Sequence, residues 1–311
     1  MERKERIRFD ITKYQGVFPA FYACYEDDGT VSTTRTKALA RYLKNKGVKG
    51  LYVGGSSGEC IYQSVEERKL ILESVMEEVG SEMTIIAHVA CNNTADSQIL
   101  AAHAESLGVD AIAAIPPIYF HLPPYGIAEY WNDISAAAPN TDFIIYNIPQ
   151  LAGVSLTQDL LQEMRKNPRV IGVKNSSMPT QDIEIWEEVG GPEFVVMNGP
   201  DEQFVSGLAM GATGGIGGTY AVMPELFLKI YELYQNGDVK RAAEVQHKAC
   251  HVIYTMCGAH GNLYAVMKEI LKRRGVNVGT VRKPLPALTE SDLTVVESAM
   301  EQIDAAIAEF C

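Results

Sequence analysis

The sequence predicts an α/β protein, a (β/α)8 TIM barrel with a C-terminal helical extension. The first supporting observation is a series of short apolar runs, each followed by a polar or glycine-containing turn and then by a segment of helical periodicity. The second is that these runs start roughly 20 to 35 residues apart, the length of a strand, a helix and two loops. The runs occupy residues 16–20, 50–53, 84–89, 111–115, 143–146, 170–173, 194–197 and 214–217.

A third observation is that most of these runs are apolar throughout and do not alternate with polar residues. Strands that helices cover on both faces have this composition, because neither face meets water. Eight such strand and helix units are the number that closes a (β/α)8 barrel. A doubly wound open sheet is the alternative, and it needs fewer strands than the sequence offers.

Signals at helix starts agree with this arrangement and place its end. Ser64 and Glu67 fit a capping box in front of an apolar helical stripe, and Thr180 precedes another helix. After about residue 224 the pattern contains helices only, the last of them amphipathic. We therefore expect the barrel to cover residues 1–223, with a helical extension over residues 224–311 packed on it.

The bulk composition restricts the classes of partner. The 311 residues are 47% hydrophobic and 21% charged, with a formal net charge of −12. Because nucleic-acid binding requires clustered Lys and Arg, this charge argues against a general nucleic-acid partner. No apolar stretch approaches the roughly 18 residues of a membrane span. Residues 1–6 are charged and lack a following signal-peptide core, which predicts a cytoplasmic location.

The cysteine, histidine and glycine patterns predict neither a metal nor a cofactor. None of the six cysteines belongs to a C-x-x-C pair. His247 and His251 have i,i+4 spacing but lack the acid of H-E-x-x-H, so a packing or surface role is favoured over a metal-dependent aldolase. The glycine-rich segment 211–218 follows a predicted helix, whereas a dinucleotide fingerprint follows a strand. His88, near a strand end, is interpreted as a core histidine.

Polar residues follow three of the apolar runs, where a barrel places its active site. The carboxyl ends of barrel strands meet at one mouth, so residues after different runs converge there. One run precedes Gly-Gly-Ser-Ser-Gly-Glu at residues 54–59, in which glycines permit close backbone approach and two hydroxyls can bind a carboxylate. Another run ends in Tyr146, and a third precedes Lys174 with Ser176 beside it.

A lysine and a tyrosine at one mouth have a specific use in carbonyl chemistry. A desolvated Lys174 amine would lose its proton and could add to a ketone to form a Schiff base. The phenol of Tyr146 could then transfer the protons that imine formation and carbon–carbon cleavage require. The alternatives are a Lys174 whose amine reaches solvent and a Tyr146 that packs in the core. Their placement with the paired serines favours the catalytic interpretation.

The chain resembles the N-acetylneuraminate lyase and dihydrodipicolinate synthase family of class I aldolases. The motifs that carry the resemblance are Gly-Gly-Ser-Ser-Gly-Glu at 54–59, Tyr-Asn-Ile-Pro at 146–149 and Gly-Val-Lys at 172–174, in this order and at this spacing. The resemblance covers nearly the whole chain. It implies a (β/α)8 barrel with C-terminal helices, a homotetramer, and catalysis without a cofactor or a metal.

The resemblance also implies roles for individual residues. Lys174 corresponds to the Schiff-base lysine that captures pyruvate, and Tyr146 to the tyrosine that transfers protons. Ser56 and Ser57 correspond to the residues that hold the substrate carboxylate. The resemblance also places Ser56 among the catalytic residues. Tyr119, in a Pro-Pro-Ile-Tyr sequence, matches the tyrosine that one subunit lends to the site of its neighbour.

The segments that differ between branches of the family bear on the substrate. The synthase branch, which forms a dicarboxylate, has an arginine two residues after the proline, where this chain has Leu151. Its absence disfavours aspartate semialdehyde as the acceptor. Asn-Gly-Pro-Asp-Glu at residues 198–202 is similar to the lyase branch, whose acidic pair hydrogen-bonds the hydroxyl-rich tail of sialic acid. Gly199, Asp201 and Glu202 are therefore predicted substrate contacts.

Two further predicted substrate contacts depart from the lyase pattern. Gly218 stands where lyases usually have a serine that touches the sugar tail, and Ser176 replaces a threonine. The resemblance implies reversible cleavage of N-acetylneuraminate to N-acetylmannosamine and pyruvate. The alternatives are another pyruvate-dependent aldolase or synthase of the family, such as a 2-keto-3-deoxy sugar acid lyase, and a non-catalytic sugar-acid sensor.

Overall fold

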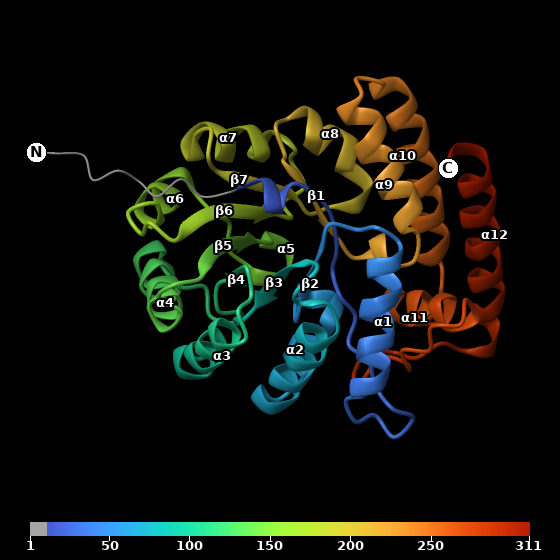
Figure 1. Cartoon of the computed structure of the whole chain (residues 1–311), viewed down its shortest axis with the longest axis horizontal. Coiled ribbons are helices and arrows are strands. Elements are labelled where there is room, and N and C mark those ends of the chain that lie inside the picture. Colours follow the sequence, from blue (N-terminus) through green and yellow to red (C-terminus); the bar gives the residue numbers. More distant parts are fainter. Residues whose placement is uncertain (1–10) are drawn as a thin grey trace, which may run out of the picture.

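Eight parallel strands form a nearly closed barrel in the computed structural model, which describes residues 11–311 (Figure 1). Neighbours in the sheet follow the order β1-β8-β7-β6-β5-β4-β3-β2, and β1 meets β2 through a single parallel bridge between Ala20 and Tyr52. The strands are β1 (Gly16–Pro19), β2 (Gly50–Val53), β3 (Thr84–His88), β4 (Ala111–Ala114), β5 (Asp142–Asn147), β6 (Val170–Asn175), β7 (Val195–Asn198) and β8 (Gly214–Gly217).

Helices surround this barrel, and the last three lie together on one side of it (Figure 1). The helices are α1 (Thr33–Asn45), α2 (Val65–Val79), α3 (Thr94–Ser106), α4 (Pro124–Ala137), α5 (Pro149–Ala152), α6 (Gln158–Met164), α7 (Gln181–Gly190), α8 (Phe204–Ala209), α9 (Pro224–Gln235), α10 (Val239–Met256), α11 (Leu263–Arg273) and α12 (Leu293–Phe310). Helix α9 contacts both β1 and α8, so it covers the barrel wall. A domain boundary between residues 223 and 224 stays a prediction.

All eight apolar runs form strands, which confirms the predicted barrel. Their ends differ from the prediction by no more than two residues, and β6 continues through Lys174 to Asn175, where the sequence had suggested a lysine just beyond the strand. The strands are apolar because side chains on both faces are buried. One cluster fills the barrel interior, and a second packs between strands and helices.

The helix predictions are confirmed as well. Ser64 and Glu67 form the capping box that starts α2, in which each residue bonds the backbone N–H of the other. Helix α7 begins one residue after Thr180. The glycine-rich segment is strand β8, where a Cβ on Gly214 would lie 2.1 Å from the backbone oxygen of Gly16. This glycine therefore serves close strand contact.

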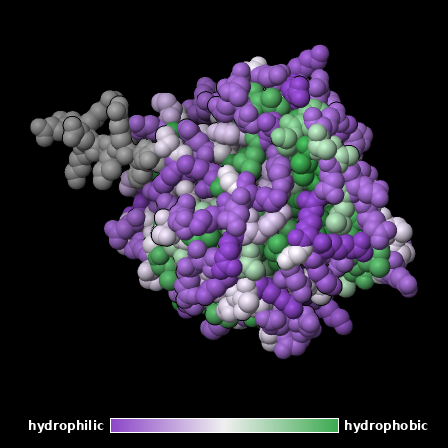
Figure 2. Space-filling model, turned by 45° about the vertical axis from the view of Figure 1, so that its right-hand side comes forward, coloured by the Kyte–Doolittle hydropathy of each residue, from purple (hydrophilic) through white to green (hydrophobic). Residues whose placement is uncertain are grey.

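Polar side chains cover most of the face that carries the C-terminal helices, and hydrophobic residues form separate patches there (Figure 2). His247 and His251 are both exposed on α10, in agreement with a surface role. In residues 11–311, no helix has the length and the apolar composition required to cross a membrane.

Candidate active site

A cavity of about 330 Å³ opens at the carboxyl ends of the strands and brings together nine of the ten predicted site residues. This convergence follows from the barrel, because every strand ends at the same mouth. These residues come from the ends of five strands, β2, β5, β6, β7 and β8, or from the loops that follow them. The nine residues are Ser56, Ser57, Tyr146, Lys174, Ser176, Gly199, Asp201, Glu202 and Gly218.

Lys174 is buried at the centre of this group, with only 4% of its surface exposed. Its Nζ lies 3.9 Å from the ring centroid of Tyr146 and 4.2 Å from that of Tyr52. Burial lowers the pKa of the lysine to about 7, although the nearby Asp201 carboxylate opposes the shift. A large share of the amine is therefore neutral near pH 7, as a nucleophile toward carbonyls must be.

Tyr146 stands next to Lys174 because the two residues are partners in the register of β5 and β6. Its phenol is buried, and burial raises its pKa to about 12. Hydrogen bonding with the Ser56 and Ser176 side chains lowers this pKa and so offsets part of the shift. The phenol is protonated at rest, so its first action in a reaction can be to donate a proton.

The paired serines lie in a tight turn after β2. Ser56 begins a short 3-10 helix that ends at Gly58, and Glu59 follows in the left-handed conformation with φ of 53°. Ser57 is buried, and it lines the cavity together with Tyr264. Two hydroxyls on one turn beside a lysine suit a carboxylate whose adjacent carbonyl must reach the amine.

The acidic pair divides into a buried and an exposed carboxylate. Asp201 is buried, and its Oδ2 accepts hydrogen bonds of 2.6 Å from both the backbone N–H and the hydroxyl of Thr219. Burial raises the pKa of Asp201 to about 6, while the Thr219 bonds oppose that shift. Glu202 is exposed at the rim. Its carboxylate is free to accept hydrogen bonds from hydroxyls of a ligand.

Both predicted glycine contacts have a steric explanation. A Cβ on Gly199 would lie 2.0 Å from the Ser176 Oγ, so a side chain there would displace the serine. Gly218 faces more open space, because a Cβ would lie 3.1 Å from the Ser57 Oγ and 4.0 Å from an Asp201 oxygen. The absence of a side chain at Gly218 therefore enlarges the cavity beside the serine turn.

A buried polar network behind Lys174 fixes the end of β6. The Asn175 side-chain oxygen accepts hydrogen bonds from Asn147 at 2.8 Å and from the Trp186 indole at 3.0 Å. The Asn175 amide donates to Ser177 at 2.8 Å. Because these groups are buried and paired with one another, the network orients the two strand ends that carry Tyr146 and Lys174.

Tyr119 is the one predicted site residue that lies outside the cavity. Its side chain is 87% exposed, packs edge-on against Phe120, and lines a separate depression above α3 and α4. Tyr119 adopts a positive φ of 83°, which is unusual for a residue with a side chain. A role in this chain's own cavity is excluded by that position, whereas a role in a neighbouring copy stays a prediction.

The structure adds residues that the sequence reasoning missed. The terminal helices had shown no motif, yet α10 and α11 and the adjoining loops form one wall of the cavity. The only available signal was the amphipathic pattern of these helices, which does not say what their buried face meets. The residues of this wall are Ile253, Cys257, Leu263, Tyr264 and Met267. Thr219, the partner of Asp201, was also missed.

Comparison with known proteins identifies the family. The sequence model of the Dihydrodipicolinate synthetase family matches residues 13–303. This chain belongs to that family. Membership of this family agrees with the observed barrel fold and with the resemblance that the sequence motifs indicate.

Several family members are similar over almost their whole length. A protein named N-acetylneuraminate lyase, from Mediterraneibacter gnavus, is 60% identical over 304 residues, which cover 97% of this chain and 96% of that protein. N-acetylneuraminate lyase 2 of Escherichia coli is 35% identical over 297 residues, covering 94% and 95%. The solved structure of wild-type Ruminococcus gnavus sialic acid aldolase has a TM-score of 0.95 and 61% identity, covering 96% of this chain and 100% of that one.

Proposed function

We propose that this chain is a carbon–carbon lyase that reversibly cleaves N-acetylneuraminate to N-acetylmannosamine and pyruvate through a Schiff base on Lys174. The observation that carries the proposal is the buried amine, whose pKa of about 7 makes it nucleophilic near neutral pH. The 60% identity to a protein named N-acetylneuraminate lyase supports the choice of substrate.

The first half of the reaction forms the imine. The Lys174 Nζ adds to the ketone carbon of the open-chain sugar acid, while Ser56 and Ser57 hold the neighbouring carboxylate. Tyr146, protonated at rest, donates its proton to the hydroxyl of the carbinolamine, which leaves as water. The products of this step are a protonated imine on Lys174 and a phenolate at Tyr146. The positive charge beside the phenolate stabilises it.

The second half breaks the carbon–carbon bond. The Tyr146 phenolate takes the proton of the hydroxyl on the second carbon from the imine carbon. The bond between this hydroxyl-bearing carbon and the carbon next to the imine carbon then breaks, and the hydroxyl-bearing carbon leaves as an aldehyde. The electron pair moves into the iminium to give an enamine, so the steps move no electrons through a metal or a cofactor. Protonation of the enamine and addition of water then release pyruvate and restore the lysine.

The residues in the distal part of the cavity favour a substrate with a polyhydroxylated tail and disfavour a substrate with a second carboxylate there. Asp201 and Glu202 supply acceptors for hydroxyls, and Leu151 is an apolar rim residue. Of the described residues that line the cavity, Lys174 is the only basic one. A second carboxylate would therefore lie near acidic groups without a cation to bind it, which disfavours aspartate semialdehyde.

The decisive experiment has two parts. Borohydride in the presence of pyruvate is expected to fix a covalent adduct on the protein, detected by mass spectrometry and absent in Lys174→Ala. Lys166→Ala is the matched control, because the Lys166 side chain is 72% exposed and does not line the cavity. Turnover by the Lys174→Ala protein would refute the mechanism.

The second part compares substrates. We expect pyruvate release from N-acetylneuraminate and little from a 2-keto-3-deoxy sugar acid. The reverse result would assign the chain to another pyruvate-dependent aldolase of the family, for which the unfilled space beside Gly218 gives a reason. Binding of N-acetylneuraminate without turnover or a trapped imine would identify a sugar-acid sensor.

The proposal extends to assembly and location. A homotetramer is proposed from the family resemblance, with the exposed Tyr119 lent to a neighbouring copy. A cytoplasmic location stays a prediction. Apart from copies of this chain, the proposed partners are small molecules.

A further inference from the structure

A buried ion pair adjoins the turn that carries the paired serines. The Lys268 Nζ of α11 donates to the Glu59 Oε1 at 2.5 Å, and both side chains are 0% exposed. Lys268 also donates to the backbone oxygen of Thr280 at 2.9 Å, and its Nζ lies 4.7 Å from the Tyr25 ring centroid. The other Glu59 oxygen accepts from the backbone N–H of Arg282 at 2.8 Å. Both charges are thus fully paired away from water.

Glu59 is continuous with the serine turn. The Glu59 backbone N–H donates to the backbone oxygen of Ser56 at 3.0 Å, and the Glu59 backbone oxygen accepts from the Tyr62 N–H at 2.9 Å. Its left-handed backbone, with φ of 53°, is a conformation that residues with side chains rarely adopt without tertiary support. The contacts of the Glu59 carboxylate supply that support, so they influence where the turn holds its hydroxyls.

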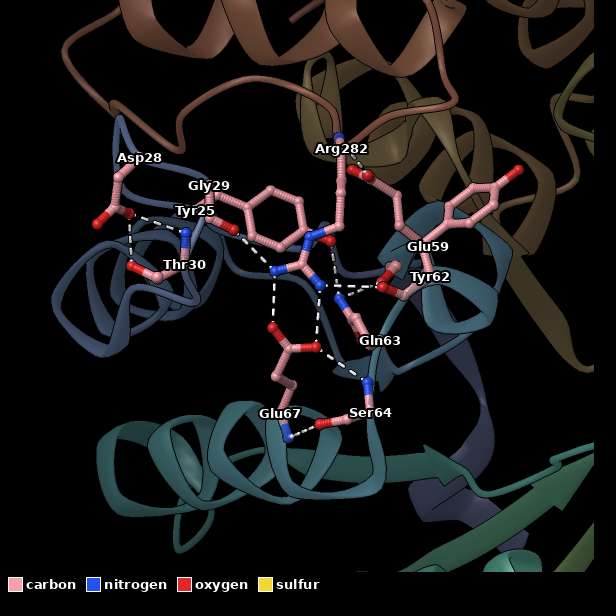
Figure 3. A network of polar contacts seen from close by, with 11 residues as sticks. Tyr25, Asp28, Gly29, Thr30, Glu59, Tyr62, Gln63, Ser64, Glu67 and Arg282 are labelled. Carbon is pink, nitrogen blue, oxygen red and sulfur yellow. Dashed lines mark hydrogen bonds and ion pairs between the residues drawn. The ribbon is translucent and has the colours of Figure 1, made fainter.

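Arg282 fixes the far end of the same connection (Figure 3). Its guanidinium bonds both carboxylate oxygens of Glu67 at 2.9 and 2.7 Å, and also the backbone oxygens of Tyr62 and Gly29. Glu67 in turn closes the capping box with Ser64 at the start of α2. The connection from β2 to α2 is therefore held at both ends by residues of the C-terminal part of the chain.

Helix α11 reaches the serine turn at a second point. Tyr264 lies one helical turn before Lys268 and lines the cavity together with Ser57. Burial raises the pKa of its phenol, and hydrogen bonding with the Ser57 side chain opposes that shift. One face of α11 therefore contacts both Ser57 and Glu59. Buried ion pairs are weak sources of stability compared with apolar packing, so their value here is geometric.

We propose that the Lys268–Glu59 ion pair positions the Ser56–Ser57 turn for the substrate carboxylate, so that α11 sets the affinity for the pyruvate moiety. Lys268 and Glu59 are positioning residues, because neither lines the cavity. The inference rests on the proposed function in one respect, that the carboxylate binds at this turn. It adds a specific role for a helix outside the strand ends.

The test uses the full chain with Glu59→Gln and Lys268→Met combined, so that neither charge is left buried alone. Imine trapping is measured against the concentration of two probes, pyruvate and acetaldehyde, which lacks a carboxylate. We expect half-maximal trapping of pyruvate to need about tenfold more ligand, since hydrogen bonds to charged groups are involved, and that of acetaldehyde to stay unchanged. Labelling of Lys174→Ala is subtracted as background.

The matched control is Arg273→Gln, which removes a cation from α11 whose ion pairs within residues 11–311 are with Glu269 and Glu297. Trapping by this variant is expected to equal that of the wild type. If the double variant does not fold, Arg282→Gln tests the other end of the same connection, because its side chain bonds Glu67, and Glu67 is partly exposed and is not left as a buried charge. In this variant we expect a smaller rise in the concentration for half-maximal trapping, for pyruvate and not for acetaldehyde.

The outcomes separate this inference from the proposed function. A wild-type chain that traps no pyruvate contradicts the proposed function, and the inference falls with it. If the wild type traps pyruvate and the variants reach half-maximal trapping at the same pyruvate concentration as the wild type, positioning by the ion pair is refuted. The proposed function would then still stand. Equal losses for pyruvate and acetaldehyde would also refute it, because they would indicate general loosening of the site.

Discussion

At the scale of single residues, the chemistry depends on how completely Lys174 is desolvated. Its Nζ sits against the rings of Tyr52 and Tyr146, which offer little solvation for a full positive charge compared with water. The Asp201 carboxylate attracts the charged amine and so offsets part of the lowering of the Lys174 pKa. The balance between these influences places the pKa near 7, where small changes in pH alter the fraction of neutral amine.

This balance gives a pH dependence. The neutral amine is the reactive form, so the rate of pyruvate trapping at limiting concentration is expected to rise about tenfold per pH unit below pH 7 and to level off above it. The measurement is the initial rate with cyanoborohydride between pH 5.5 and 9. A rate that kept rising to pH 9 would indicate an amine of ordinary pKa and contradict the assignment.

At the scale of elements, the register between β5 and β6 decides which side chains meet. Phe143 pairs with Val170, but the next pair is Ile144 with Gly172, so the register shifts by one residue. Without the shift, Tyr146 would pair with the residue before Lys174. Since successive strand residues point to opposite faces, the shift is what turns both functional side chains to the same side.

The network at Asn175 keeps these strand ends in place, so its loss should be costly. Asn175→Ala leaves the Trp186 indole and the Asn147 amide without their acceptor. We expect the free energy of unfolding to fall by about 3 kcal/mol, because buried donors remain unpaired. Urea denaturation measures this, with Asn236→Ala at an exposed helix end as the control. A loss no larger than that of the control would show that the network does not stabilise the strand ends.

At the scale of the whole molecule, a group of exposed aromatic residues identifies the face proposed to meet another copy. Tyr119, Phe120 and Tyr125 are 87%, 72% and 78% exposed. Tyr119 and Phe120 line a depression together with residues of α3 and α4. Exposed apolar patches of this kind are typical of protein–protein contact sites.

The assembly prediction concerns this face directly. Light scattering is expected to give a mass four times the 34.1 kDa of one chain. Tyr119→Phe should keep the assembly and lower turnover without abolishing imine trapping, whereas Phe120→Ser should weaken the assembly because it removes apolar contact area.

Tyr254→Ser is the control for this prediction, since Tyr254 is 61% exposed on α10, away from the aromatic group. A monomeric wild type at working concentration would refute the assembly. Unchanged turnover in Tyr119→Phe would remove that tyrosine from the mechanism.

The sequence by itself determined the barrel and most of the candidate site. Apolar strand runs and capping signals are local patterns, and each is readable without knowledge of distant residues. Once the barrel is predicted, residues after strand ends must converge, which is why Lys174, Tyr146 and the paired serines could be grouped. Local patterns mark strand ends less sharply, and β6 extends through the lysine.

The tertiary structure alone decided the features that join distant segments. The register shift before Tyr146 depends on how two strands pack, and no local pattern encodes it. The contacts of Tyr264 and Lys268 with the serine turn span about two hundred residues of sequence, as the separation of 209 between Lys268 and Glu59 shows. Amphipathic periodicity predicts that such a helix has a buried face, but only the packing determines what that face touches.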